Sequence, residues 1–256
     1  MEHEAIIRVS GLVTRFGTQV VHDGLDLEVR KGEVLGVVGG SGTGKSVLLR
    51  AIIGLKRPAA GKIEVFGQEL ARLEPEERRK LEQRWGVLFQ NGALFSSLTV
   101  AENVEAPMRE HADLPPHLMD ELAGLKIAMV GLPHDACAKY PSELSGGMRK
   151  RAGLARALAL DPEIVFLDEP TAGLDPVGAA AFDRLIRELS DTLGLTVFMV
   201  THDLDSLYAI CDRVAVLAEG KVLTVGPVAE LEQHPHPWLQ SYFHGPRARA
   251  AREARQ

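Results

Sequence analysis

The sequence predicts an α/β fold: a mostly parallel sheet covered on both faces by helices, with an inserted helical lobe. Three observations predict this class. A glycine-rich loop stands between an apolar strand and a helix. Continuous apolar runs alternate with helical segments, which favours parallel strands joined by helices. Between residues 92 and 150 the segments become helical throughout.

Composition and charge are those of a soluble globular protein of one large domain or two intimate lobes. The 256 residues are 45% hydrophobic and 25% charged. The net charge of −6 gives no global basic field, so nucleic acid is not an expected partner. Two cysteines, Cys137 and Cys211, fit a reducing cytosol. The acidic start is unlike a signal peptide, and no apolar run approaches the ~20 residues of a membrane span.

The first ninety residues predict short strands, separated by glycine-containing turns, around one helix. Alternation of period two indicates the earliest strands, and a continuous apolar run indicates the strand before the glycine loop. A charge-rich helix, broken near Pro75, follows. The predicted strands are 5–9, 25–29, 34–38, 62–67 and 86–89, and the predicted helices begin at 47 and cover 69–84.

The helical lobe has recognisable start and stop signals. Thr99 and Glu102 form a capping-box pattern, and we expect that helix to stop before Pro107. A second helix is predicted over 116–130, with Gly131 as its C-terminal stop.

The rest of the chain returns to alternating strands and helices. Ser145 can cap a helix that runs to Leu160, and Asp175 can cap one that ends at Gly194. Strands are predicted at 164–167, 196–200 and 214–217.

The glycine loop has the spacing of a phosphate-binding loop. It reads Gly39-Gly40-Ser41-Gly42-Thr43-Gly44-Lys45-Ser46. Glycines let backbone N–H groups surround phosphate oxygens, and the helix N-terminus adds positive potential. Lys45 is the expected cation for the β- and γ-phosphates, and the Ser46 hydroxyl the expected ligand of Mg²⁺. We therefore expect ATP and Mg²⁺ to bind here.

Two carboxylates follow the buried strand 164–167. Asp168 is placed to hold Mg²⁺, directly or through water, and Glu169 to accept a proton from an attacking water. The alternative is that both are solvated acids at a strand end, or that Glu169 caps a helix.

A second glycine-containing loop, Ser145-Gly146-Gly147, opens a helix. Its amides and the helix dipole can form another anion site, or Ser145 can be an ordinary N-cap. Two phosphate-binding devices on one chain predict a nucleotide shared by two copies of it.

The ordered set of motifs resembles an ABC-transporter ATPase subunit over nearly the whole chain. In chain order the motifs are GGSGTGKS, Gln90, LSGGM, LDEP, Gly173-Leu174-Asp175 and His202. The resemblance implies a RecA-like P-loop NTPase core with an N-terminal antiparallel β subdomain and an inserted helical subdomain. It implies a single ABC ATPase domain over 1–256, with a core of 1–91 and 151–233, a helical subdomain of 92–150, and a C-terminal extension of 234–256.

The resemblance also assigns roles to single residues. Phe16 would stack on adenine, although a core or hairpin aromatic is the alternative. Gln90 would touch Mg²⁺ and the attacking water, and the alternative is a surface polar residue at a strand end. His202 would contact the γ-phosphate, and the alternative is a satisfied histidine at a strand end beside a capping Asp203. Asp175 would lie at the seam between two copies, and a simple N-cap explains it equally well.

One departure from the superfamily is Met148, where most members have Gln after LSGG. Together with segments 87–95, 98–104, 141–148 and 151–157, it resembles the Mla (maintenance of lipid asymmetry) and toluene-tolerance branch, which transports phospholipid. The partners implied are a second copy, a multi-span permease, a periplasmic Mce-type lipid-binding protein and a small STAS-domain protein. The implied location is the cytoplasmic face of a bacterial inner membrane, with attachment through the permease.

Two rival functions stay open. An ATPase for another cargo (an amino acid, a metal or a sterol) shares the same core motifs. A soluble ABC ATPase of DNA repair or translation usually carries coiled coils, zinc modules or tandem cassettes, which are not seen here.

Two features near the C-terminus also have two readings. The tail Arg247, Arg249, Arg252 and Arg255 is either a docking extension or a solvated terminus. His234-Pro235-His236-Pro237-Trp238 favours a rigid turn anchored by Trp238 over a metal site.

Overall fold

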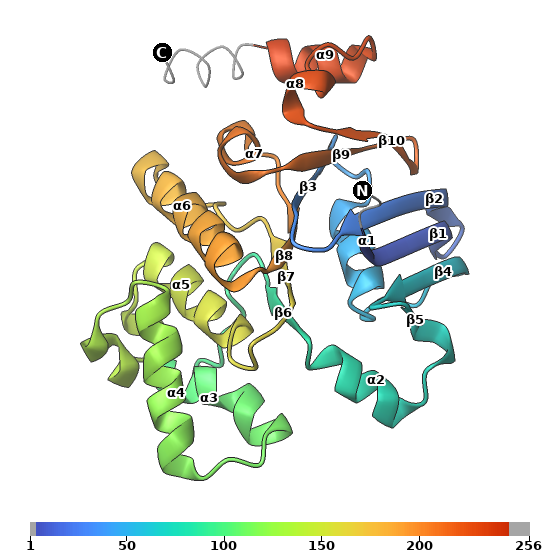
Figure 1. Cartoon of the computed structure of the whole chain (residues 1–256). Helices are drawn as coiled ribbons and strands as arrows, with labels where there is room; N and C mark the ends of the chain where they lie inside the picture. Colours follow the sequence, from blue (N-terminus) through green and yellow to red (C-terminus); the bar gives the residue numbers. More distant parts are fainter. Residues whose placement is uncertain (1–3, 246–256) are drawn as a thin grey trace. The chain divides into compact units, whose positions relative to one another are not determined.

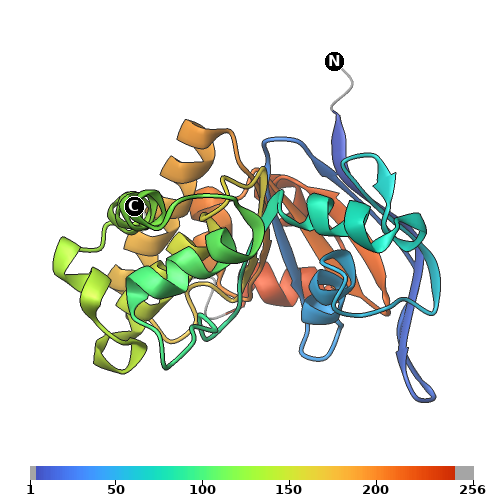
Figure 2. The ribbon, with the colours of Figure 1, turned by 90° about the horizontal axis from the view of Figure 1, so that it is seen from below.

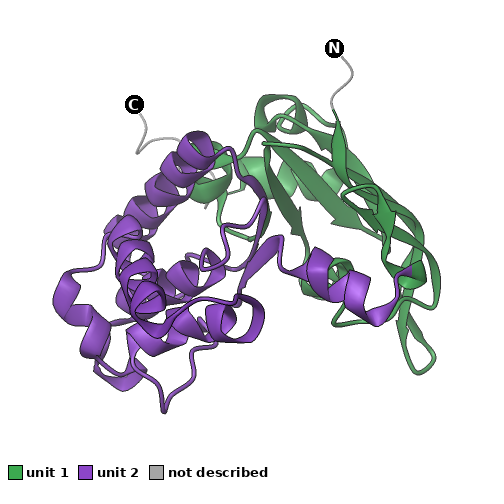
Figure 3. Cartoon of the chain, turned by 60° about the horizontal axis from the view of Figure 1, so that its bottom comes forward, with its two compact units in different colours: residues 1–72, 198–256 green, residues 73–197 purple. Residues whose placement is uncertain are grey.

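The computed structural model describes residues 4–245, which fall into two compact units (Figures 1 and 3). Unit 1 joins the N-terminal segment up to residue 72 with the segment from residue 198 onward, and unit 2 is the stretch 73–197 between them. The arginines of the C-terminal tail lie outside the described residues.

Unit 1 contains an antiparallel sheet in the strand order β2-β1-β4-β5. Its β1–β2 hairpin is the long blue ribbon of Figure 2. The sequence predicted much shorter strands here, because Gly11 and Gly24 resemble turn residues. Both have positive φ, 58° and 71°, and each lies at a shift of the β1–β2 register. They form β-bulges inside continuous strands, and only Gly17 belongs to the turn. The strands are β1 (Ala5–Phe16), β2 (Gln19–Arg30), β4 (Ala60–Val65) and β5 (Gln68–Glu69).

The second part of unit 1 is the parallel pair β3 and β9, with β10 antiparallel to β9. Helices α7, α8 and α9 contribute to the buried cluster that includes Val38, Val216 and Phe243. These helices and β10 were not predicted. The elements are β3 (Val34–Gly39), α1 (Lys45–Ile52), the 3-10 helix η1 (Leu70–Arg72), α7 (Leu204–Ile210), β9 (Arg213–Ala218), β10 (Lys221–Gly226), α8 (Val228–Leu231) and α9 (Pro237–His244).

Unit 2 contains the parallel pair β6 and β7, in which Trp85 is opposite Ile164. Every residue of β7 is buried, as its continuous apolar run predicts. The chain passes from unit 2 to unit 1 within β8. The elements are α2 (Pro75–Glu82), β6 (Trp85–Leu88), β7 (Ile164–Asp168), α6 (Pro176–Leu193) and β8 (Thr196–Val200). Pro75 begins α2, so the predicted break at this residue is confirmed.

The helical part of unit 2 packs α3, α4 and α5 on one another. Their bounds are α3 (Val100–His111), α4 (Pro116–Met129) and α5 (Gly146–Ala157), with the 3-10 helices η2 (His134–Ala138) and η3 (Pro141–Glu143) between α4 and α5. Gly131 and Gly194 end α4 and α6 in left-handed conformations, φ 70° and 68°, as predicted.

Two helix ends differ from the prediction. Helix α3 continues through Pro107 to His111, and α5 ends at Ala157 rather than Leu160. Pro107 removes one backbone hydrogen bond, but the residues around it, Val104 and Met108, are almost fully buried against the neighbouring helices. Tertiary packing therefore holds the helix together across the proline.

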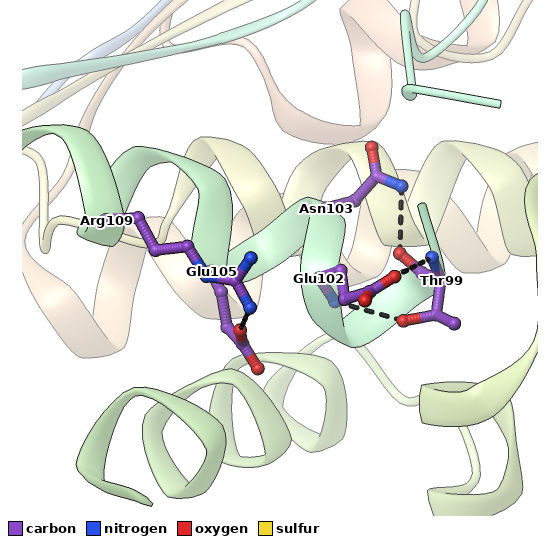
Figure 4. A network of polar contacts seen from close by, with 5 residues as sticks. All are labelled: Thr99, Glu102, Asn103, Glu105 and Arg109. Atoms are coloured by element: carbon purple, nitrogen blue, oxygen red, sulfur yellow. Dashed lines mark hydrogen bonds and ion pairs between the residues drawn. The ribbon is translucent and has the colours of Figure 1, made fainter. Parts of the chain in front are cut away.

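The capping box at the start of α3 is confirmed (Figure 4). The Glu102 N–H donates to Thr99 Oγ1 at 3.2 Å, and the Thr99 N–H donates to Glu102 Oε2 at 2.7 Å. The α/β class, the parallel pairing and the N-terminal antiparallel sheet are confirmed as well. The predicted boundaries of the helical lobe, at 92 and 150, stay predictions.

Candidate functional site

The glycine loop connects β3 to α1 in unit 1, and its backbone needs glycine at specific points. A Cβ on Gly39 would lie 2.5 Å from the Leu217 carbonyl oxygen. Gly44 has φ 94°, and a Cβ there would lie 2.5 Å from both His22 Nε2 and Val21 Cγ1. A side chain at either residue would therefore displace its neighbours, so these two glycines let the loop pass close to β9 and β2.

Lys45 is folded back over this loop. Its Nζ donates to the carbonyl oxygens of Gly39, at 2.9 Å, and Gly40, at 3.1 Å. The Thr43 hydroxyl donates to the Gly40 carbonyl as well, at 2.9 Å. Helix α1 begins directly after Gly44, which has no side-chain cap, and its first turn has no acidic residue. A cation beside a helix N-terminus that has no side-chain cap is an arrangement that favours the binding of an anion.

Phe16 lies at the end of β1, on the surface of unit 1. Its side chain is 53% exposed, and Lys56 Nζ lies 4.0 Å from the centre of its ring. It is therefore a hairpin aromatic rather than a core residue, and one with an accessible ring.

His202 follows β8 in unit 1, two residues past the end of the strand, and is exposed. The Thr201 N–H donates to the Val37 carbonyl at 3.2 Å, which ties this turn to β3 just before the glycine loop. Asp203 caps α7 by accepting from the Asp205 N–H.

Helix α9 contacts both the glycine loop and the His202 turn, which the sequence did not predict. The Tyr242 hydroxyl donates to the His202 carbonyl at 3.2 Å. Trp238 stacks on Tyr242 at 4.7 Å between ring centres, and its Nε1 lies 3.5 Å from the position a Cβ would take on Gly40. The only sequence signal was the aromatic content of the segment.

The turn before α9 agrees with its prediction as a rigid turn. His234 Nδ1 accepts from the His236 N–H at 3.2 Å, and His236 Nδ1 accepts from the Trp238 N–H at 3.3 Å. Each histidine therefore uses one ring nitrogen to fix the backbone. Across residues 4–245, no group of three or more His, Cys, Asp or Glu side chains is arranged to hold a metal ion.

In unit 2, β7 ends at Asp168, whose side chain is buried, and Glu169 follows it with φ 51°. The left-handed conformation is uncommon for a residue other than glycine and clusters at functional sites. The Glu169 carbonyl accepts from the Ala172 N–H at 3.2 Å and from Lys150 Nζ at 2.8 Å. Burial lowers the pKa of Lys150, while the charges of Glu169 and Asp168 act in the opposite direction. The sequence did not predict this contact, because the two residues are 19 positions apart.

The Ser145 loop opens α5, also in unit 2. Ser145 Oγ accepts from the Met148 N–H at 3.2 Å, so Ser145 is the N-cap of α5. A Cβ on Gly147 would lie 3.8 Å from Leu174 Cδ2, which places this loop beside the turn that leads to Asp175. Asp175 caps α6 by accepting from the Gly178 N–H at 2.9 Å. Both loops are exposed at their polar residues.

Gln90 is exposed after β6, and the loop behind it is attached to α5. Arg156 donates to the carbonyls of Ala93, at 2.7 Å, and Gly92, at 3.0 Å. A Cβ on Gly153 would lie 3.1 Å from Gly92 Cα, so the loop and the helix are in close contact.

The predicted site residues thus fall into two groups. Unit 1 contains Phe16, residues 39–46 and His202, and unit 2 contains Gln90, residues 145–147, Asp168, Glu169 and Asp175. The predicted metal ligands, Ser46, Gln90 and Asp168, offer a hydroxyl, an amide oxygen and a carboxylate, which is the hard-oxygen chemistry that Mg²⁺ prefers.

Comparison with protein-family models gives a match to the family described as ABC transporter over residues 22–172. A second model, of an AAA domain, matches residues 139–207. Within residues 4–245, no helix has the length and apolar character needed to cross a bilayer.

Curated relatives match at similar identity, but their names indicate different cargoes. The "Intermembrane phospholipid transport system ATP-binding protein MlaF" of Haemophilus influenzae is 40% identical over 231 residues, covering 90% of this chain and 87% of the relative. The "Probable ribonucleotide transport ATP-binding protein mkl" of Mycobacterium bovis is 39% identical, covering 94% and 67%. The "Methionine import ATP-binding protein MetN" of Mesorhizobium japonicum is 40% identical, covering 87% and 60%.

Among solved structures, an ATP-binding cassette determined as a dimer in "a post-hydrolysis state" bound to ADP and Pi superposes with a TM-score of 0.79 at 28% identity. The match covers 86% of this chain and 98% of that cassette.

Proposed function

The chain belongs to the ABC transporter family, and from that premise we propose that it is an ATP-hydrolysing motor subunit that moves phospholipid between the inner and outer membranes of a bacterium. The observation that carries the ATPase part is the loop Gly39–Ser46, where Lys45 lies over the loop carbonyls at the N-terminus of a helix that has no side-chain cap. The phospholipid cargo depends on sequence resemblance.

ATP binding is assigned to unit 1. Lys45 exchanges its two loop carbonyls for the β- and γ-phosphate oxygens, while the amides of residues 39–46 surround them. The exposed ring of Phe16 stacks on adenine, and His202 contacts the γ-phosphate. The link from His202 through Tyr242 to Trp238 supports a common nucleotide site for this unit.

Hydrolysis is assigned to Glu169 and Gln90, as the resemblance to ABC ATPases implies. Glu169 accepts the proton of the attacking water, and Gln90 orients this water. Bound Mg²⁺, held by Ser46, Asp168 and Gln90, would neutralise the developing charge on the phosphates. The left-handed backbone of Glu169 supports a functional role, since it holds that side chain in an orientation the extended strand would not give.

The complete site needs two copies of the chain. The Ser145–Gly147 loop of one copy closes over the γ-phosphate bound by the Lys45 loop of the other, and Asp175 lies at the seam. The exposed start of α6 supports this assignment, because Val177, two residues past Asp175, is 78% exposed. Loss of the γ-phosphate removes contacts on both sides, so the dimer opens. The helical lobe 92–150, inserted between the core segments 1–91 and 151–233, carries this motion to the permease.

The cargo assignment is supported by the MlaF relative, whose match covers 90% of this chain and 87% of the relative. Met148 and the segments that resemble the Mla branch support it too. It brings the proposed partners: a multi-span permease, a periplasmic Mce-type protein and a small STAS-domain protein, at the cytoplasmic face of the inner membrane. The competing cargoes, including amino acids and ribonucleotides, are favoured by relatives of similar identity.

Two substitutions separate ATP binding from hydrolysis. Glu169→Gln keeps the ATP affinity and removes the base, so turnover falls by about 10²-fold or more and a closed dimer accumulates. Lys45→Ala weakens ATP binding itself, which equilibrium binding of labelled ATP measures. Brisk turnover of Glu169→Gln, or an unchanged ATP affinity of Lys45→Ala, would refute the assigned roles.

The cargo is tested by purifying the chain from its own bacterium with its membrane partners. We expect a permease of several spans, and phospholipid identified by mass spectrometry in the complex. Recovery of an amino-acid or nucleotide permease, with no lipid enrichment over a control membrane protein, would overturn the phospholipid assignment and leave the ATPase assignment intact.

A further inference from the structure

Helix α5 contains a buried lysine that the mechanism above does not use. Lys150 is only 6% exposed, although lysine is among the residues least often buried. Its Nζ atom donates to the backbone carbonyl of Glu169 at 2.8 Å. An ammonium group kept from water is costly unless it is hydrogen-bonded, so its contact with this carbonyl needs an explanation.

The carbonyl that Lys150 binds belongs to the residue with the unusual backbone. Glu169 has φ 51°, and its carbonyl also accepts from the Ala172 N–H at 3.2 Å. Two donors on one carbonyl fix the orientation of this peptide group. The direction of the Cα–Cβ bond follows from the backbone angles. Fixing the peptide therefore also fixes the direction in which the Glu169 side chain leaves the backbone.

The same helix reaches the other functional loops of unit 2. Its N-cap is Ser145, about 7.5 Å along the helix axis from Lys150. Further along, Arg156 holds the loop that follows Gln90 through the Gly92 and Ala93 carbonyls. An α-helix is rigid over this length, so a displacement of the Ser145 loop is transmitted to the Lys150 ammonium.

We propose that Lys150 is a positioning residue for the Glu169 carboxylate and couples it to the Ser145 loop of the same chain. In this role Lys150 acts through the Glu169 peptide, to which its Nζ donates. When the Ser145 loop engages the ATP of a second copy, α5 and Lys150 hold Glu169 ready to act on the ATP of its own chain. This inference rests on the proposed function, in which Glu169 is the general base.

The test uses the full chain with Mg·ATP, and compares two buried lysines of unit 2. Lys150→Met keeps the length and the apolar stem but removes the donor. Lys126→Met is the matched control, since Lys126 is 4% exposed and pairs with Asp161, away from Glu169. We expect kcat of Lys150→Met to fall about 10- to 100-fold with KM for ATP changed less than about twofold, while kcat of Lys126→Met stays within about twofold. Lys150→Arg, which keeps a donor, recovers part of the loss.

A double-mutant cycle separates positioning from general damage to the fold. In the Glu169→Gln background the carboxylate is gone, so adding Lys150→Met should not lower the residual turnover further. Three results would overturn the proposal. The first is that Lys150→Met lowers kcat by the same factor in both backgrounds. The others are that the two lysine variants lower kcat equally, or that kcat of Lys150→Met is unchanged. If Glu169→Gln itself keeps full turnover, Glu169 is not the general base of the proposed function. The positioning role of Lys150 is then refuted as well.

Discussion

His22 is a polar side chain in contact with the glycine loop, and its surroundings set its charge. It has no exposed surface, and its Nδ1 lies 2.8 Å from Thr14 Oγ1. Burial lowers the pKa of His22, and the nearby backbone of Gly44 offsets part of this. An imidazole whose pKa is lowered is neutral at pH 7. His22 therefore adds no positive charge to the glycine loop at this pH.

This burial predicts a pH dependence of stability. In the unfolded chain His22 titrates near pH 6.5, and in the folded chain at lower pH. Between those values only the unfolded state takes up the proton, so the free energy of unfolding decreases as the pH falls below about 6.5. Chemical denaturation from pH 7.5 to 5.0 measures the slope, which His22→Leu should flatten. His117→Leu, an exposed position on α4, should leave it unchanged. Equal slopes for the wild type and His22→Leu would contradict this account.

At the scale of elements, α3 depends on the side chain of Asn103 (Figure 4). Asn103 is fully buried. Its Oδ1 accepts from the Phe95 N–H at 2.7 Å, and its Nδ2 donates to the carbonyls of Phe95, Leu98 and Thr99 at 2.9–3.1 Å. The side-chain amide of Asn103 therefore holds the backbone of the segment that leads from the Gln90 loop into α3.

We predict that Asn103→Leu lowers the free energy of unfolding by about 2–4 kcal/mol, because it leaves several backbone groups without their partners. Thr99→Ala, which removes only the hydroxyl of the capping box, should cost about 1 kcal/mol. Urea denaturation of the two variants gives the comparison. A cost for Thr99→Ala as large as that for Asn103→Leu would show that the amide does not hold this connection.

The elements also show which structure a sequence encodes locally. The capping box and the glycine ends of α4 and α6 were predicted, because their signals lie within a few residues of one another. The continuation of α3 through Pro107 was missed, since it depends on packing against α4 and α5. Gly11 and Gly24 were read as turns, because a glycine in a bulge and one in a turn give the same local signal.

At the scale of the whole molecule, the motifs were found from their spacing, but their supports were not. The chemistry of the Lys45 loop and of the pair Asp168–Glu169 can be predicted from a few consecutive residues. Their supports come from distant segments: Lys150 binds the peptide of Glu169, and Tyr242 binds the carbonyl of His202. Sequence spacing alone cannot predict such contacts, which arise only once the chain has folded.

The central claim is that each ATP is held by two copies of the chain. We predict that two defective variants complement one another when mixed. In the Glu169→Gln background, Lys45→Ala disables one half of a site and Ser145→Arg the other half, so each variant alone should retain little ATP. A mixed dimer has one site with both defects and one site with neither.

Retention of labelled ATP by the mixture after gel filtration is the most direct measurement. With random pairing we expect about a quarter of the ATP retained by Glu169→Gln alone, since half of the dimers are mixed and each has one intact site of two. If Lys45 and Ser145 of the same copy formed the site, every site would carry one defect. The mixture would then retain no more than the average of the two variants, and that result would contradict the account.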